Sequence, residues 1–191
     1  MFMRTDTGRL YESWSRDNGE TWSEGRPTQL MSVNSPAQLR KVPGTGDLLV
    51  VFNQGSLVEA QADFYRSRLS TAISRDQGKT WTHFQNIESS IEGVHTPARP
   101  IELDLPWIVE GLNPRDDDLA GFPPRPPAAD KKSHGRLYAR FTYPSAIFHG
   151  DRLIIGHPDY HWDKNGKLLR EGRLRVVPIS WLYGGKQARA I

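Results

Sequence analysis

Short apolar runs recur along the chain, and each is about the length of one β-strand. The runs are rich in Val, Ile, Tyr, Phe, Trp and Thr and are bounded by Gly, Asp, Asn or Pro, which is typical of strands separated by turns. No segment keeps the i, i+3, i+4, i+7 apolar spacing of an amphipathic helix over three turns. The pattern therefore predicts an all-β protein, with its clearest strands at 10–15, 47–53, 69–74, 145–148, 153–156 and 174–179.

One eight-residue motif occurs twice. Ser-Arg-Asp-Asn-Gly-Glu-Thr-Trp at 15–22 returns as Ser-Arg-Asp-Gln-Gly-Lys-Thr-Trp at 74–81, with six of the eight positions identical. Its aspartate can accept backbone N–H groups inside a tight turn, and its glycine can take the positive φ that such turns need. Trp22 and Trp81 end the two copies, and both are expected to leave the turn for the interior between neighbouring sheets. A repeat carried by hairpins predicts propeller blades.

The repeat resembles the Asp-box, or bacterial neuraminidase repeat, of the sialidase superfamily. The resemblance implies a six-bladed β-propeller, present over residues 1–191 as an incomplete set of about three blades, with the boxes at the periphery in structural roles. The residues that carry it are Ser15, Asp17, Gly19, Thr21, Trp22, Ser74, Asp76, Gly78, Thr80 and Trp81. Residues 102–135 break the rhythm, since they are rich in proline and poor in β-branched residues, and they are predicted to form a long loop.

Three further segments resemble the parts of sialidases that carry substrate-binding and catalytic residues. Arg4, ahead of the first box, matches one arginine of a carboxylate-binding triad, and Arg66, with Arg68 as the fallback, matches a second. Tyr143 matches the nucleophilic tyrosine. Planar guanidinium groups bind carboxylates bidentately, and a neutral phenol approaches an anionic sugar without the repulsion that a carboxylate nucleophile would meet. The resemblance therefore implies a site for a carboxylate-bearing sugar.

The implied activity is that of a sialidase-like exo-glycosidase, which hydrolyses terminal sugars such as sialic acid from glycans. In that family a third arginine, an acid/base aspartate and a glutamate precede the strand that Arg4 matches, so this chain resembles a C-terminal portion and is expected to be inactive alone. Two alternatives stay open: another glycan-active Asp-box hydrolase or lyase, and a noncatalytic carbohydrate-binding propeller module. An incomplete propeller is also expected to self-associate through exposed blade edges.

Other residues have simpler interpretations that remain open. Arg4 can be an ordinary surface residue at a strand end, and Tyr143 before Pro144 can be a packed edge aromatic. His157, Asp159, His161 and Asp163 alternate and could meet a metal on one face of an extended segment, but Pro158 and the turn at 164–166 favour an exposed loop. The run Asp116-Asp117-Asp118 lacks the spacing of a calcium loop. No metal and no cofactor are therefore expected.

Composition narrows the function classes further. The chain has no cysteine, which excludes disulfides and thiolate chemistry, and no apolar run approaches the roughly 18 residues that a membrane span needs. Its 25 Lys and Arg are scattered among 22 Asp and Glu, giving a formal net charge of +3 without a basic patch, so nucleic acid is not an expected partner. No signal peptide is visible, and the compartment stays open, with a secreted or periplasmic parent protein as one option.

Overall fold

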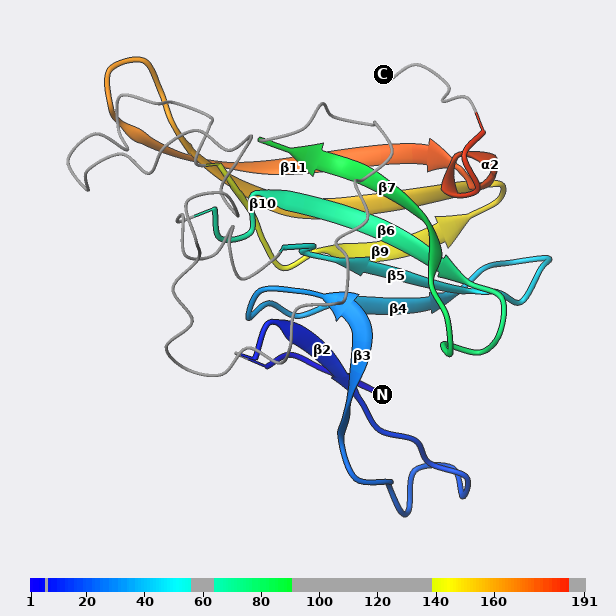
Figure 1. The fold of residues 1–191 in the computed structure, drawn as a ribbon. Helices are drawn as coiled ribbons and strands as arrows, with labels where there is room; N and C mark the ends of the chain where they lie inside the picture. Colours follow the sequence, from blue (N-terminus) through cyan, green and yellow to red (C-terminus); the bar gives the residue numbers. More distant parts are fainter. Residues whose placement is uncertain (6, 56–63, 91–138, 186–191) are drawn as a thin grey trace, which may run out of the picture.

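The structure is a computed structural model, and it describes residues 1–5, 7–55, 64–90 and 139–185 (Figure 1). The described chain is all-β apart from one short helix, α2 (Ile179–Leu182). Its strands form three antiparallel sheets that follow one another along the chain. Among the described residues there is no helix with the length and hydrophobicity to cross a lipid bilayer.

The first two sheets are built from consecutive strands. In the first sheet β1 (Phe2–Met3) pairs with β2 (Arg9–Glu12), which pairs with β3 (Arg26–Met31). The second sheet has the order β4-β5-β6-β7, and each of its strands pairs with the next one in sequence. Its members are β4 (Gln38–Lys41), β5 (Leu48–Phe52), β6 (Arg68–Ser74) and β7 (Thr82–Ser89). A four-stranded meander of this kind is the unit of a propeller blade.

The third sheet is organised around one long strand. β10 (Arg152–Trp162) pairs on one side with β11 (Leu168–Pro178) along its full length. On its other side it pairs first with β9 (Ser145–His149) and then with β8 (Arg140–Phe141). The break between β8 and β9 holds Tyr143 and lies opposite His157 and Pro158 of β10.

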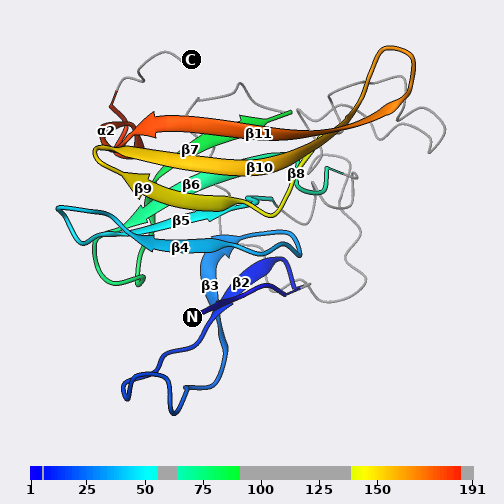
Figure 2. The ribbon, with the colours of Figure 1, turned by 180° about the vertical axis from the view of Figure 1, so that it is seen from behind.

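The sheets pack face to face through two apolar clusters. One cluster joins the second and third sheets and has Leu69, Ile87, Leu153 and Ile155 at 0% exposure. The other joins the first and second sheets through Leu10, Leu30, Phe52 and Trp81. Figures 1 and 2 show the first sheet at the bottom, with the second and third sheets above it, one behind the other. The prediction of an all-β, incomplete β-propeller of about three blades is confirmed.

Both Asp-box motifs form tight turns with the same hydrogen bonds. The first lies between β2 and β3, and the second lies between β6 and β7. The carboxylate of Asp76 accepts from the backbone N–H of Thr80 at 2.8 Å and from its hydroxyl at 2.6 Å, and Asp17 is bonded to Thr21 in the same way. The serine hydroxyl of each box accepts from the glycine N–H at 2.7 Å. Gly19 and Gly78 have φ of +97° and +92°, which a side chain would strain.

The two box tryptophans have different environments. Trp81 is 5% exposed and packs against Phe2 of the first sheet with ring centroids 5.8 Å apart. Trp22 is 47% exposed, so the prediction that both indoles enter the interior is wrong for Trp22. Its Nε1–H donates to the carbonyl of Gly19 at 3.0 Å, which closes the ring over its own turn. The difference arises because the neighbouring sheet covers the second box and no described sheet covers the first.

Two strand predictions also need correction. The segment expected to be an exposed loop at 157–163 is instead the second half of β10, with His157, Asp159 and His161 buried. Pro158 lies opposite the break between β8 and β9, where neither strand pairs with it in register, and its carbonyl accepts from the N–H of Thr142 at 3.2 Å. At the other end, the strand predicted through residue 179 stops at Pro178, where α2 begins. The predicted loop at 102–135, with its aspartate run, lies outside the described residues.

Candidate functional site

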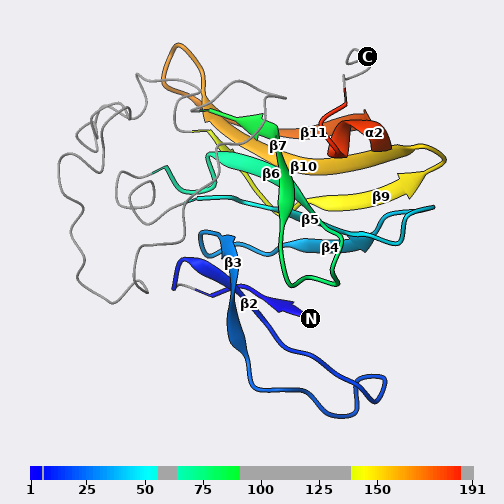
Figure 3. The ribbon, with the colours of Figure 1, turned by 45° about the vertical axis from the view of Figure 1, so that its right-hand side comes forward.

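The topology brings the predicted site residues to one end of the sheets. Arg4 lies between β1 and β2, and β2 leads from there to the first Asp-box; Arg66 precedes β6, which leads to the second Asp-box. Tyr143 lies between β8 and β9, next to the last residues of β10. Figure 3 shows the starts of β6 and of β2 and the far end of β10 on the same side of the molecule. The boxes and the predicted site therefore occupy opposite ends of the sheets.

These three residues line one open depression with a volume of about 890 Å³. Arginine and aromatic side chains dominate its described lining, and no aspartate or glutamate is among them. The lining residues are Arg4, Asn34, Tyr65, Arg66, Arg140, Thr142, Tyr143, Tyr160, Trp162 and Leu168. A pocket that combines cationic guanidinium groups with aromatic rings and lacks carboxylates favours an anionic ligand. We call it the arginine-tyrosine pocket.

Backbone contacts hold Arg66 and Tyr143 in fixed relative positions. The N–H of Phe141 donates to the carbonyl of Arg66 at 3.0 Å, which joins the segment before β6 to β8. Asn53, at 0% exposure, donates from Nδ2 to the carbonyls of Phe141 at 2.7 Å and Arg68 at 2.8 Å. Its own Oδ1 accepts from the hydroxyl of Ser35 at 2.6 Å. A buried and satisfied amide of this kind fixes the pocket wall across two sheets.

Both residues also have backbone conformations that side chains rarely adopt. Arg66 has φ of 59° and Tyr143 has φ of 44°, in the left-handed region that favours glycine. Such conformations cost on the order of 1 to 3 kcal/mol each and persist where the surroundings over-determine them, often at ligand sites. Here the surroundings are the Phe141–Arg66 hydrogen bond and the Asn53 bridge. The strain places both side chains in the same depression.

The two arginines act directly on the hydroxyl of Tyr143. Hydrogen bonding by Arg66, followed by hydrogen bonding by Arg4 and the charge of Arg66, lowers the pKa of Tyr143 below its ordinary value of 10.0. The guanidinium carbon of Arg66 lies 5.4 Å from the centroid of the tyrosine ring, and its Nη2 donates to the carbonyl of Asn34 at 2.6 Å. Tyr143 is 56% exposed, so a ligand can reach its hydroxyl. It is not the packed edge aromatic of the alternative interpretation.

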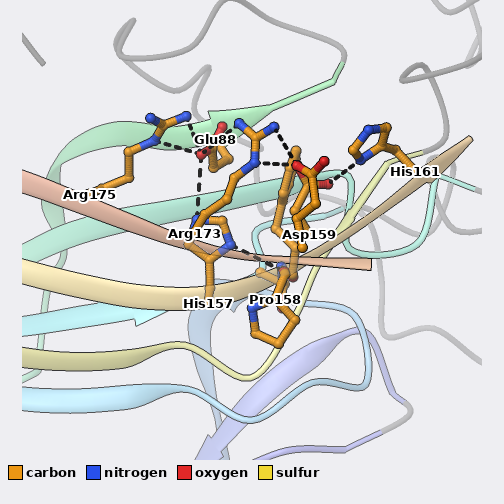
Figure 4. Close-up of polar contacts among 10 residues, drawn as sticks. Glu88, His157, Pro158, Asp159, His161, Arg173 and Arg175 are labelled. Carbon is orange, nitrogen blue, oxygen red and sulfur yellow. Dashed lines mark hydrogen bonds and ion pairs between the residues drawn. The ribbon is translucent and has the colours of Figure 1, made fainter. Parts of the chain in front are cut away.

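A buried ionic cluster lies on the other face of β10 (Figure 4); the sequence singled out its three β10 residues as a metal alternative but not their partners on β7 and β11. Glu88 of β7 has a side chain that is 1% exposed, and it accepts from Nε of Arg175 at 2.6 Å. Its Oε1 is also 3.5 Å from Nε2 of His157. In the same cluster Asp159 lies 2.6 Å from Nε of Arg173 and 3.3 Å from Nδ1 of His161. The cluster joins the second and third sheets, as the apolar core does.

Burial is the largest influence on Glu88 and by itself raises its pKa, but the cluster reverses the shift. The hydrogen bond from His157 and the positive charge of Arg175 outweigh it, so the pKa of Glu88 is lowered below its usual range. A lowered pKa means that this contribution to stability is present above about pH 4.5 and is lost as the pH falls through the folded-state value. Glu88 is therefore an ionised, structural carboxylate.

A group of acidic and histidine side chains on β10 and β11 lies close enough together to hold a metal ion. Asp159, His161 and Glu171 offer ligand atoms within 4.8 Å of one another. Arg173 lies among them, however, with Nε 2.6 Å from Asp159 and Nη2 3.4 Å from Glu171, and it already supplies the positive charge that these carboxylates need. The four-residue set suggested by the sequence does not assemble either, since Asp163 caps the turn before β11 by accepting from the N–H of Lys167 at 2.9 Å.

The sequence of the chain matches a known family of domains. A model of the BNR repeat-like domain matches residues 1–155. This chain is a BNR repeat-like domain. No curated protein matches its sequence. The turns formed by its two Asp-boxes are thus the repeats that define its family.

Solved structures with a related arrangement come from a Fusarium graminearum enzyme. Two are of the α-L-arabinofuranosidase Arb93A with an iminosugar inhibitor, each at 15% identity and a TM-score of 0.39. A third is the GH93 α-L-arabinofuranosidase with arabinobiose, at 14% identity and a TM-score of 0.38. Each match covers 89% of this chain and 40% of the enzyme, so this BNR repeat-like domain spans less than half of the length of the structures it matches. Similarity at this level carries no information on substrate.

Three of the four predicted site residues lie together in this BNR repeat-like domain. Arg4, Arg66 and Tyr143 come together in the arginine-tyrosine pocket. Arg68, the fallback, does not line it, because its side chain is 1% exposed within β6. The sequence missed Arg140 and the other aromatic residues of the pocket, which are Tyr65, Tyr160 and Trp162. The only local signal for them was the alternation of aromatic Tyr160 and Trp162 with the polar residues of β10.

Proposed function

We propose that the arginine-tyrosine pocket binds the carboxylate-bearing terminal sugar of a glycan, such as sialic acid, in a sialidase-like exo-glycosidase. Arg4 and Arg66 bind the carboxylate, and Tyr143 is the nucleophile. The observation that carries the proposal is the convergence of two guanidinium groups on the accessible hydroxyl of Tyr143, whose pKa they lower. The BNR repeat-like family of the chain agrees with it at the level of the fold.

The proposed chemistry is a two-step displacement. The oxygen of Tyr143 attacks the anomeric carbon while the bond from that carbon to the leaving oxygen breaks, which gives a tyrosyl-linked sugar. Water then hydrolyses this link and restores the tyrosine. Arg66 and Arg4 favour the phenolate character that the attack requires, since they lower the pKa of Tyr143. No described lining residue carries a carboxyl group, so both the base that takes the phenolic proton of Tyr143 and the acid that protonates the leaving oxygen must lie outside the described lining.

Two other functions make different demands on the pocket. A hydrolase for neutral sugars, such as the arabinofuranosidases among the solved structures, has no substrate carboxylate for Arg4 and Arg66 to bind. A noncatalytic carbohydrate-binding module would use the same lining without a covalent step. The absence of acidic residues from the described lining favours an anionic ligand over a neutral one.

Binding measurements test the carboxylate claim. The methyl glycoside of sialic acid is titrated into the protein by NMR, alongside its carboxyl methyl ester and arabinobiose. Charge-assisted hydrogen bonds contribute about 1.5 to 3 kcal/mol each, so the free acid should bind at least about tenfold more tightly than the ester. Arg66→Gln should remove this difference, and Arg16→Gln, at an exposed box position outside the pocket, should keep it. Equal binding of acid and ester, or a preference for arabinobiose, would contradict the proposal.

A covalent probe separates catalysis from simple binding. A fluorinated sialosyl fluoride carries a leaving group that needs no protonation, so it can react with Tyr143 without a general acid. Mass spectrometry should find the label on Tyr143 and no label after Tyr143→Phe. If the free acid binds but no residue is labelled, the pocket is a binding module and Tyr143 is not a nucleophile.

A further inference from the structure

We propose that Tyr160 and Trp162, together with Leu168, form a second subsite in the arginine-tyrosine pocket, which binds the sugar that precedes the terminal residue of the glycan. The inference rests on the proposed function for the orientation of the glycan. It assigns a role to pocket residues other than the two arginines and Tyr143. We call these three residues the aromatic shelf.

The alternation of β10 creates the shelf. Successive side chains of a strand point to opposite faces, and His157, Asp159 and His161 are buried against the second sheet. Tyr160 and Trp162 therefore point to the other face, where both line the pocket. Leu168 is the register partner of Trp162 on β11 and is 40% exposed, so it extends the same surface.

The shelf lies directly beside the nucleophile candidate. Tyr160 is the register partner of Arg140 on β8, and Tyr143 follows three residues after Arg140. Thr142, between them, donates its N–H to the carbonyl of Pro158 at 3.2 Å, which ties the Tyr143 segment to β10. A glycan whose terminal sugar contacts Tyr143 thus has its next sugar within reach of the shelf.

The size of the pocket agrees with more than one sugar ring. Its volume of about 890 Å³ lies at the upper end of the roughly 300 to 1,000 Å³ found for sites that bury drug-sized ligands. Besides Arg4, Arg66 and Tyr143, the lining holds the three side chains of the aromatic shelf. A single monosaccharide would leave the shelf uncovered.

The chemistry of the shelf favours a sugar over a purely apolar group. A flat aromatic ring packs against the apolar C–H face of a pyranose, whereas the hydroxyl groups around that face need polar partners. Arg140 lines the pocket beside Tyr160, and the guanidinium carbon of Arg170 is 6.0 Å from the centroid of the Tyr160 ring. Aromatic faces flanked by arginine donors suit a ligand that has both kinds of surface.

The test compares a monosaccharide with a longer glycan in matched variants. Sialyllactose and the methyl glycoside of sialic acid are titrated into the wild-type chain, Trp162→Ala and Trp22→Ala. An aromatic contact of this kind should make sialyllactose bind about two- to tenfold more tightly than the monosaccharide. Trp162→Ala should weaken the binding of sialyllactose more than that of the monosaccharide and so remove this advantage. Trp22, an exposed tryptophan outside the pocket, is the control, and its variant should keep the advantage.

Several outcomes would overturn the shelf. They are equal binding of both ligands to the wild type, an advantage for sialyllactose that survives Trp162→Ala, and an equal loss for both ligands in that variant. Trp162→Leu, which keeps apolar volume but loses the flat ring, replaces Trp162→Ala if thermal unfolding shows that the alanine variant is not folded. Binding of lactose alone that depends on Trp162, without discrimination between sialic acid and its ester, would support the shelf and reject the carboxylate proposal. No binding of any of these ligands would reject both.

Discussion

At the scale of single residues, the pocket is defined by a tyrosine whose surroundings are unusual for an exposed phenol. Most exposed tyrosines contact water alone, but Tyr143 has arginine partners at its hydroxyl and a left-handed backbone. Tyr183, directly after α2, provides a comparison because its pKa is shifted in the other direction. Burial raises the pKa of Tyr183; the hydroxyl of Thr45 opposes that shift, and the hydrogen bond and charge of Asp47 add to it.

The pKa values of the two tyrosines should therefore be shifted in opposite directions from the ordinary value. We expect the pKa of Tyr143 to lie below 10.0 and that of Tyr183 to lie above it. Tyrosine labelled with ¹³C at Cζ reports both values by NMR. Arg66→Gln should raise the pKa of Tyr143 toward 10.0 and leave Tyr183 unchanged, because Arg66 makes the largest contribution to the shift. A Tyr143 that titrates at or above Tyr183 would contradict the described geometry.

The box aspartates make a second prediction at this scale. Hydrogen bonds from the side chain of Thr80, then from its backbone N–H and from Ser74, lower the pKa of Asp76 from 3.8 to about 2. A lowered pKa stabilises the folded state fully above the unfolded value, and this stabilisation is lost as the pH falls from about 4 through 2. Asp76→Asn should flatten the fall in unfolding free energy over that range, measured by urea denaturation. An unchanged pH dependence would show that Asp76 is not bonded as described.

At the scale of secondary structure elements, β10 combines two functions. One of its faces contributes His157 and Asp159 to the ionic cluster, and the other contributes Tyr160 and Trp162 to the pocket. The cluster fixes β10 against β7 of the second sheet, so it also fixes the pocket wall. A change in the cluster should therefore affect the stability of the fold first and the pocket through it.

Glu88 should be the most sensitive residue of the cluster. Glu88→Gln leaves the guanidinium groups of Arg173 and Arg175 without their shared buried anion, and breaking a buried ion pair costs about 3 to 5 kcal/mol. Glu171→Gln is the matched control. Its side chain is 47% exposed, so the loss should be about 0.5 kcal/mol or less. Urea denaturation measures both, and equal losses would refute a structural role for the cluster.

At the scale of the whole molecule, the packing of one sheet on the next decides which repeated residues matter for stability. Trp81→Ala should destabilise the fold by about 3 to 5 kcal/mol, because it opens a cavity between the first and second sheets. Trp22→Ala should cost about 1 kcal/mol or less, since its indole is half exposed. Thermal unfolding compares the two variants. A larger loss for Trp22→Ala than for Trp81→Ala would contradict the packing of the two sheets around Trp81.

Self-association through exposed sheet edges also belongs to this scale and stays a prediction. Within the described residues, β3 and β11 each pair with a strand on one side only. Unpaired strand edges offer free N–H and carbonyl groups to another chain. Sedimentation velocity over a range of concentrations should show a mass that rises above the 21.7 kDa of one chain. A constant mass at high concentration would contradict this expectation.

The sequence alone determined what local chemistry can encode. Each Asp-box turn closes through hydrogen bonds between residues two and four positions apart, so eight residues suffice to specify it. The short apolar runs predicted the all-β class, and the repeat carried the family resemblance that selected Arg4, Arg66 and Tyr143 from three separate segments. Only the tertiary structure brought them into one pocket, because the Phe141–Arg66 bond and the Asn53 bridge join residues from 15 to 88 positions apart in the chain.

Which side chains are buried was likewise decided by the tertiary structure. Two identical box tryptophans differ tenfold in exposure because a neighbouring sheet covers one and not the other. The polar residues of β10 looked like an exposed loop, since the arginines that neutralise them lie on β11 and Glu88 lies on β7. A turn depends on its own residues, whereas the free energy of burying a side chain depends on what packs against it, and those partners are distant in sequence.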